Sequence, residues 1–262
     1  MTGAEGEEAG EAHESAGAEG LIRSTVDQLR ADPRVLGVLL VGSWARGDAL
    51  RGSDVDLEVL VRERPPVPFE LRRGEPPGGE GAEPQRRGAI PPTVEIAYLD
   101  PETWRERLRS NAMSLYSFLD GRVLFEHDGA LSELSHLARE RWRAFRWPEE
   151  KVAATRQWLE SACVKVRAAQ EEGDRLRAAL ILATTHWAIL EALWMVNGLP
   201  MPPVGGVMAH LDDLKVTPAE FRTDVRVLLL GEYYERLVAG LRIMDWTVQE
   251  LEAVRGGRGA RR

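Results

Sequence analysis

The feature that most constrains the fold is a near-continuous apolar run, VLGVLLV at residues 35–41. Such a run is typical of a strand that is buried on both faces of a sheet. Residues 54–61 alternate between apolar and charged side chains, which predicts a second strand with one polar face. The segment TVEIAYL at residues 93–99 predicts a third strand. The N-terminal part of the chain is therefore expected to form a sheet with flanking helices.

Helical signals dominate from residue 101 to the end. Asp100 and Pro101 are favourable residues for a helix N-cap and first turn. A short strand is expected at 123–125. Before residue 101, helices are predicted at 21–30 and 44–51; after it they are predicted at 129–143, 149–171, 174–197 and 218–252. The predicted fold class is α+β, with a mixed N-terminal sheet and flanking helices followed by a C-terminal helical bundle.

Composition shifts suggest the domain boundaries. Residues 1–20 are rich in Gly, Ala and Glu and are expected to be a disordered tail. A sheet domain is predicted at 21–127, within which the Pro- and Gly-rich residues 62–92 form a flexible insertion. A helical domain is predicted at 128–254, and a basic tail, RGGRGARR, at 255–262.

Charge and composition exclude some classes of partner. The net charge of −8 argues against a nucleic-acid backbone as the main partner. No apolar run reaches the length of about 20 residues that spans a bilayer, so no membrane partner is expected. The N-terminus lacks the basic start and apolar segment of a signal peptide. Cys163 is the single cysteine, which suits a reducing compartment. We therefore expect a cytoplasmic protein.

The residues between the first two strands indicate phosphate and metal chemistry. Gly42 and Ser43 follow the buried strand, where a glycine lets backbone approach a phosphate and a helix N-terminus offers free N–H groups. Asp54 and Asp56 are two residues apart on the next strand, so their carboxylates lie on one face, about 6–7 Å apart along the chain. Adjacent carboxylates are ligands that suit Mg²⁺.

Glu95, in the third strand, is the expected third carboxylate. Three carboxylates could hold two Mg²⁺ ions, which would activate a hydroxyl and neutralise a triphosphate. The alternative is that Asp54 and Asp56 are only the solvent face of an edge strand, a face that Glu58 continues. We interpret Glu58 as structural. Asp100 is a second candidate for the third ligand, although its N-cap position explains it without a metal.

The segment GSWARGDALRGSDVDLEV resembles the active-site signature of the DNA polymerase β-like nucleotidyltransferase superfamily, within it the minimal and aminoglycoside (kanamycin-type) nucleotidyltransferases. The resemblance covers about residues 35–100, and the helical part is only loosely similar to the helical domain of kanamycin-type enzymes. It implies that 21–127 is a nucleotidyltransferase domain and 128–254 a substrate-binding domain. It also implies NTP as co-substrate and Mg²⁺ ligands at Asp54, Asp56 and Glu95. The predicted nucleotide-binding residues are Gly42, Ser43, Trp44, Arg46 and Ser53.

The acceptor is the open question at this stage. The main hypothesis is transfer of a nucleoside monophosphate to a hydroxyl of a small molecule, with an aminoglycoside-like antibiotic as candidate and antibiotic resistance as the role. Glu191, in an otherwise apolar helix, is the tentative general base. The alternative is an antitoxin-type enzyme that transfers AMP to a partner protein. A helical RNase and a binding module without catalysis are weaker hypotheses. A homodimer is a further hypothesis, which rests only on analogy with the antibiotic enzymes.

Overall fold

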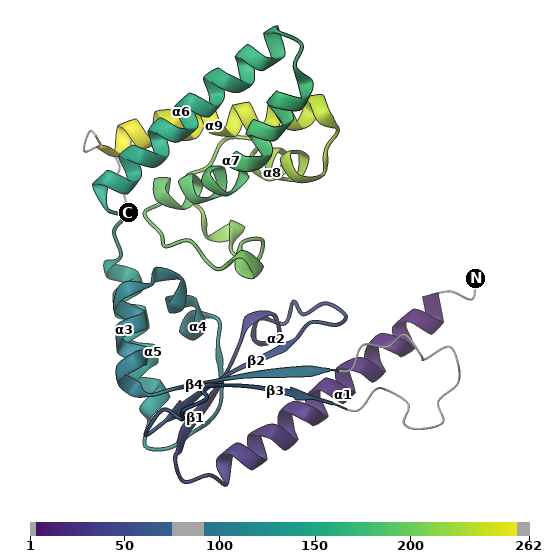
Figure 1. Ribbon diagram of the computed structural model, residues 1–262, viewed down its shortest axis with the longest axis vertical. Helices are drawn as coiled ribbons and strands as arrows, with labels where there is room; N and C mark the ends of the chain where they lie inside the picture. Colours follow the sequence, from purple (N-terminus) through teal and green to yellow (C-terminus); the bar gives the residue numbers. More distant parts are fainter. Residues whose placement is uncertain (1–3, 75–91, 256–262) are drawn as a thin grey trace. The chain divides into compact units, whose positions relative to one another are not determined.

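The computed structural model describes residues 4–74 and 92–255, and the side chains of residues 17–74 and 92–253. The chain forms two compact units. The N-terminal unit comprises Met1–Arg143 and Pro203–Gly206, and the helical unit comprises Ala144–Pro202 and Val207–Arg262. The elements of the N-terminal unit (Figure 1) are α1 (Ala4–Arg30), β1 (Val35–Val41), α2 (Gly42–Arg46), β2 (Val55–Val61), β3 (Phe69–Arg73), β4 (Thr93–Leu99), α3 (Pro101–Ser110), the 3-10 helix η2 (Ala112–Leu115), α4 (Tyr116–Leu119), β5 (Arg122–Glu126), α5 (Ala130–Ala144) and the 3-10 turn η3 (Val204–Gly206).

The strands form one mixed sheet in the order β3-β4-β2-β1-β5. β1 pairs antiparallel with both β2 and β5, and β3 pairs antiparallel with β4, whereas β2 and β4 run parallel. The three strands expected at 35–41, 54–61 and 93–99 are confirmed as β1, β2 and β4. The mixed sheet with flanking helices and C-terminal helices confirms the predicted α+β class.

Helices cover both faces of the sheet, which explains the apolar run of β1. On one face, Val26 of α1 packs in a cluster with Leu57 of β2. On the other face, Trp104 of α3 and Leu131 of α5 pack in a cluster with Leu60 of β2. Figure 1 shows α1 lying along the sheet on one side, with α3, α4 and α5 on the other. A central strand between two such layers has no solvent face, so both of its alternating sets are apolar.

Helix α1 and strand β3 differ from the sequence-based expectation. α1 begins at Ala4, so residues expected in a disordered tail continue the helix; Ala and Glu are strong helix formers. β3 lies inside the insertion expected at 62–92, where it extends the sheet beyond β4. Residues 75–91 of that insertion lie outside the described residues, as does most of the expected basic tail at 255–262.

The boundary between the units also differs from the expected one at residue 127. α5 belongs to the N-terminal unit because Leu131, Leu134 and Ala138 are buried against the sheet. The single helix expected at 218–252 is two helices, separated at Gly231. A Cβ at Gly231 would lie 2.6 Å from the Val227 carbonyl oxygen, so this turn has no room for a side chain.

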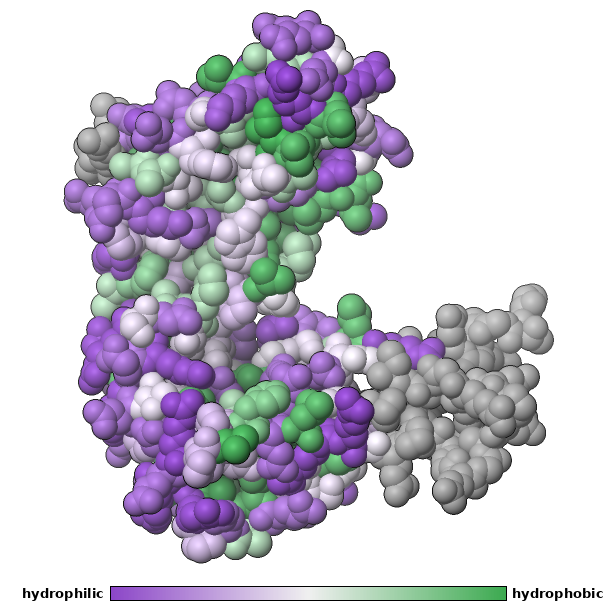
Figure 2. All heavy atoms as spheres, in the orientation of Figure 1, coloured by the Kyte–Doolittle hydropathy of each residue, from purple (hydrophilic) through white to green (hydrophobic). Residues whose placement is uncertain are grey.

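The helical unit is built around one apolar core. Its elements are α6 (Glu149–Glu171), α7 (Arg175–Val196), the 3-10 turn η4 (Leu211–Asp213), α8 (Phe221–Leu230) and α9 (Tyr233–Arg255). Leu193 and Trp194 of α7 are fully buried in this core. By length and composition alone α7 could cross a membrane, but the core helix of a soluble protein passes the same test. In the most apolar window of α7, 44% is buried inside the protein. Figure 2 shows apolar residues on the surface of this unit, and Leu176 and Leu230 are among the exposed ones.

Candidate active site

Strand register brings Asp56 and Glu95 side by side. β1 and β2 pair Val41 with Asp56, and β2 and β4 pair Asp56 with Glu95. Residues paired directly across neighbouring strands point to the same face of a sheet. Asp56 and Glu95 therefore lie next to each other, beside the end of β1. Asp54 is exposed and lies directly before β2.

The turn after β1 is shaped around the carboxylate of Asp56. Gly42 has a φ of +70°, a left-handed conformation that favours glycine. A Cβ at this position would lie 2.6 Å from Asp56 Oδ2, inside van der Waals contact. α2 ends at Gly47, whose N–H donates to the Ser43 carbonyl oxygen at 2.9 Å. The Gly-Ser turn and the aspartate thus form one compact feature.

The ionised form of the Asp56 carboxylate is destabilised by its surroundings. Burial, followed by repulsion from Glu95 and Asp54, raises the pKa of Asp56 to about 6, against an opposing effect of Arg46. Within residues 4–74 and 92–255, no three His, Cys, Asp or Glu side chains are arranged to hold one metal ion. Mg²⁺ is commonly held by one or two carboxylates with water and substrate phosphates, so an adjacent pair is a sufficient protein contribution.

Glu58 is a further carboxylate on the same face, and it is half-buried, with its Oε2 atom hidden from solvent. Burial raises its pKa to about 7, opposed by a hydrogen bond with Ser117 and by the charge of Arg107. Its Oε2 atom has no hydrogen-bond partner. The alternation of β2 predicts that Glu58 lies on a polar face. In the structure α4 packs over Glu58, through Ser117, and the sequence pattern did not indicate this contact.

A pocket of about 520 Å³ opens beside the Gly-Ser turn, a size typical of ligand sites. Among the predicted site residues, it is lined by Gly42, Ser43, Arg46, Ser53 and Asp56, but not by Trp44, Asp54 or Glu95. Further lining residues are Val41, Asp48, Leu50, Tyr116, Ser117, Asp120, Pro203, Gly205 and Gly206. Asp48 follows the Arg-Gly of the motif and could have been proposed from the sequence. The residues of α4 and of 203–206 could not, because they reach the pocket only through the fold.

Arg46 connects three parts of the pocket wall. Its Nε lies 3.2 Å from Asp48 Oδ2, and its Nη1 lies 3.9 Å from Asp120 Oδ2. Its Nη2 donates to the Gly205 carbonyl oxygen at 2.9 Å. The side chain is 13% exposed. These contacts support a role in holding the wall together, and direct nucleotide binding by Arg46 stays a prediction.

Trp44 and Ser53 brace the loop between α2 and β2. The Trp44 indole N–H donates to the Ser53 carbonyl oxygen at 3.2 Å, and Trp44 packs against the apolar cluster on the α1 face. The Ser53 hydroxyl accepts from the Leu50 N–H at 2.9 Å. These contacts support a structural role for both residues, and their predicted contact with nucleotide stays a prediction.

Glu191, the tentative base, belongs to the helical unit. Its Oε2 atom lies 2.9 Å from Lys151 Nζ, and 15% of its side chain is exposed. An ion pair of this kind supports a structural role, because the carboxylate already has a cationic partner. The role of Glu191 as general base stays a prediction.

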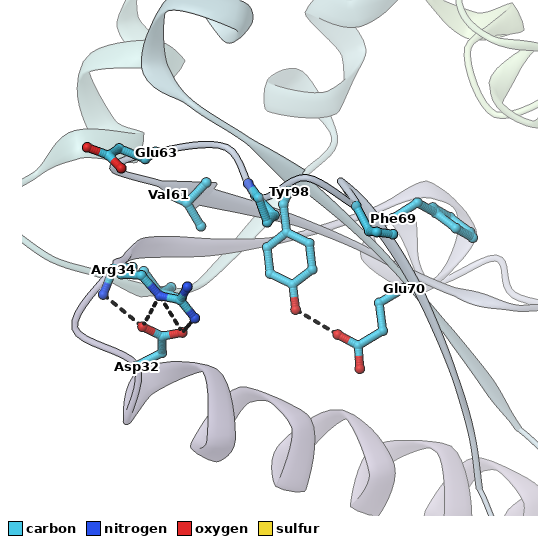
Figure 3. A pocket seen from close by; sticks show the side chains of 10 residues that line it. Asp32, Arg34, Val61, Glu63, Phe69, Glu70 and Tyr98 are labelled. Carbon is cyan, nitrogen blue, oxygen red and sulfur yellow. Dashed lines mark hydrogen bonds and ion pairs between the residues drawn. The ribbon is translucent and has the colours of Figure 1, made fainter.

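A second pocket, of about 290 Å³, lies on the α1 face of the sheet. Tyr98 and Glu95 are an odd number of residues apart on β4, so their side chains point to opposite faces of the sheet. Figure 3 shows Tyr98 and Glu70 pointing toward each other, with the Tyr98 hydroxyl donating to Glu70 at 2.8 Å. Asp32 and Arg34 form an ion pair at the rim. Because these polar groups are already paired and the carboxylates of the motif face away, this pocket is not the candidate active site.

One family model matches the part of the chain that contains the Gly-Ser turn. Residues 22–92 match the family model described as a nucleotidyltransferase domain, and the match ends just before the strand that carries Glu95. No curated protein matches the chain. A solved structure of a nucleotidyltransferase-like protein from Exiguobacterium sibiricum is 17% identical, with a TM-score of 0.44, over 90% of this chain and 76% of that one. Residues 22–92, which contain the Gly-Ser turn, Asp54 and Asp56, are therefore similar to a nucleotidyltransferase domain.

Proposed function

We propose that this chain transfers a nucleoside monophosphate from an NTP to a hydroxyl group of a small-molecule acceptor, in a Mg²⁺-dependent reaction that releases pyrophosphate. The observation that carries the proposal is the register of β1, β2 and β4, which sets Asp56 and Glu95 side by side at the Gly-Ser turn. Transfer of this kind requires positioning and neutralisation of charge more than covalent participation by the protein.

The donor set fits divalent cations. The adjacent pair Asp56 and Glu95 would hold Mg²⁺, with Asp54 as the predicted further ligand, and the ion would lower the pKa of the acceptor hydroxyl and neutralise the triphosphate. The raised pKa of Asp56 supports this assignment, because it reflects burial first and then repulsion from Glu95 and Asp54, both of which a bound cation would offset. Carboxylate oxygens are the ligands that Mg²⁺ prefers.

The remaining residues of the site would position the nucleotide. Gly42, without a side chain, leaves the Asp56 carboxylate against the turn and leaves the backbone accessible to a phosphate. The N–H groups and hydroxyl of the turn at Ser43 would donate to phosphate oxygens. The pocket beside the turn has room for the rest of a nucleotide.

The proposed acceptor is a small, cationic, hydroxylated molecule of the aminoglycoside kind, which would place this enzyme among antibiotic-resistance proteins. Two observations support a small acceptor. The net charge of −8 favours polycationic substrates. The chain also holds a complete helical unit in addition to the sheet, and such a unit would offer a surface for the acceptor.

Label transfer tests the proposal. The protein is incubated with MgCl₂ and each of the four α-³²P-labelled NTPs, with a panel of aminoglycosides, and products are separated by chromatography. We expect label on a small-molecule acceptor, and a loss of roughly 100-fold or more in Asp56→Asn and Glu95→Gln. Asp32→Asn, which makes the same chemical change on the opposite face, is the matched control and should keep its activity.

Three outcomes are distinguished. Label on protein instead of on a small molecule would replace the proposed acceptor with a protein. Full activity of Asp56→Asn and Glu95→Gln would show that the assigned carboxylates are wrong. A requirement for Mg²⁺ is checked by adding EDTA, and activity that survives EDTA would contradict the metal assignment.

A further inference from the structure

The loop that follows α7 contains four residues, Pro203–Gly206, that belong to the N-terminal unit. Pro202 and Val207 belong to the helical unit, whereas Pro203–Gly206 belongs to the N-terminal unit. The segment is closed into a turn by a hydrogen bond from the Gly206 N–H to the Pro203 carbonyl oxygen at 2.7 Å. A local turn with its own hydrogen bond is a defined structure that can present a fixed surface.

Arg46 fastens this segment to the Gly-Ser turn. Its Nη2 donates to the Gly205 carbonyl oxygen at 2.9 Å, while Nε and Nη1 face Asp48 and Asp120. Arg46 is the last residue of α2, the helix that begins at Gly42. The segment is therefore held by the same short helix that presents the candidate phosphate-binding turn.

The segment forms part of the wall of the pocket beside that turn. Pro203, Gly205 and Gly206 line the pocket together with Ser43 and Asp56. Gly205 is exposed, and a Cβ built on it would meet only Arg46 Nη2, at 3.9 Å. The packing of the chain thus does not require glycine at position 205, and a larger side chain there would occupy space beside Arg46 at the pocket wall.

The pocket fits the nucleotide better than the acceptor. It surrounds the Gly-Ser turn but does not include Glu95 or Asp54. In the transferred phosphoryl group, the attacking and leaving oxygens lie roughly in line on opposite sides. A triphosphate held at the turn therefore leaves the acceptor to approach from the Glu95 side.

We infer that Pro203, Gly205 and Gly206 are part of the nucleotide-binding site, with Gly205 and Gly206 in contact with the bound nucleoside triphosphate. Arg46 acts as a positioning residue that keeps the segment in place. The inference rests on the proposed function, because it takes the ligand of the pocket to be an NTP. It assigns a binding role to a segment far from the signature motif in sequence.

The test is a side chain added at Gly205. Binding of the α,β-methylene analogues of ATP, GTP, CTP and UTP, each with MgCl₂, is measured by calorimetry on the full chain, since these analogues cannot be turned over. We expect Gly205→Val to raise the dissociation constant of the preferred analogue at least about tenfold. In the transfer assay its KM for NTP should rise while its KM for the acceptor is unchanged.

Val204→Ile is the matched control. Val204 lies in the same segment, is 72% exposed and does not line the pocket. We expect its affinity for the analogue to stay within twofold of wild type. Gly205→Ala is the smaller step, to be used if Gly205→Val does not fold, and it should weaken binding in the same direction by a smaller factor. Melting temperatures identify variants that are only unfolded.

The outcomes separate the two proposals. Wild-type protein that binds no analogue would overturn both the proposed function and the inference. Wild-type binding that is equally strong in Gly205→Val, or in Gly205→Ala where only that variant folds, would overturn the inference and leave the proposed function intact. Equal weakening in Val204→Ile and Gly205→Val would also overturn it, because the effect would then come from the segment as a whole and not from the pocket wall.

Discussion

At the scale of single residues, Glu58 shows how burial and charge conflict in this site. It follows Asp56 by two positions on β2 and points to the same face, yet it is covered and one of its oxygens has no partner. Burial raises its pKa to about 7. A half-buried carboxylate with one oxygen that lacks a partner costs free energy when it ionises, so Glu58 makes the folded state sensitive to pH.

Replacing Glu58 with Gln should therefore stabilise the protein at high pH. The folded pKa, about 7, lies above the ordinary value of 4.5, so the folded state binds more protons between these values and stability falls as pH rises through this window. At pH 8, Glu58→Gln should gain about 2 kcal/mol in the free energy of unfolding, and at pH 4.5 it should gain little.

The measurement is urea unfolding at both pH values, with EDTA present. Glu106→Gln is the control, because Glu106 is exposed in a surface pair with Arg109 and should change stability little at either pH. An equal gain at pH 4.5 and pH 8 would contradict the role of ionisation, since a neutral Glu58 and a Gln differ little in charge.

At the scale of elements, the turn from β1 into α2 couples backbone shape to the carboxylate of Asp56. Both ends of α2 have glycines with positive φ, Gly42 at +70° and Gly47 at +81°. The space around them differs. A Cβ at Gly42 would collide with Asp56, whereas a Cβ at Gly47 would meet nothing within 4 Å. A side chain at Gly47 would therefore introduce backbone strain alone, whereas a side chain at Gly42 would introduce strain and a clash with the Asp56 carboxylate.

Alanine at the two glycines should give different results. Gly47→Ala should lose about 1–2 kcal/mol of stability from the left-handed backbone alone and keep transferase activity. Gly42→Ala should lose more stability, and its activity should fall at least about tenfold because Asp56 is displaced. Urea unfolding and label transfer measure the two effects. Equal loss of activity in both variants would show that the contact with Asp56 is not what matters.

At the scale of the whole molecule, the chain holds its apolar cores in separate units. Two clusters, one on each face of the sheet, belong to the N-terminal unit, and a third belongs to the helical unit. The proposed nucleotide pocket is lined by the N-terminal unit alone. The separate cores predict that stability of the helical unit and nucleotide affinity can be changed independently.

A homodimer and a cytoplasmic location stay predictions.

Leu193→Ala tests that independence. Leu193 is fully buried in the core of the helical unit, so the variant should lose about 2–5 kcal/mol in the unfolding transition of that unit. The affinity for the Mg²⁺-bound NTP analogue should stay within about twofold, because Leu193 does not line the pocket. Calorimetry measures both quantities. A matching loss in every thermal transition would contradict separate cores.

The sequence by itself determined the features that depend on neighbouring residues. Strand β1 and helix α6 occur at the expected residues, because alternation, apolar runs and terminal prolines act locally. The N-cap at Asp100 also occurs as expected, with its carboxylate accepting the Thr103 N–H at 2.8 Å. The Gly-Ser turn and Asp56 were likewise readable, because they follow one another within a single motif.

Only the tertiary structure decided what these elements face. The pattern of β2 showed that Glu58 alternates with apolar residues, but not that α4 covers it. Glu95 was a candidate by its strand, yet the parallel pairing of β2 and β4 sets it beside Asp56. α5 joins the sheet, and 203–206 reaches the pocket, through contacts between residues distant in sequence. The periodicity of a strand or helix indicates which of its faces is buried. The element that packs on that face is set by contacts between residues distant in sequence, which a local pattern does not encode.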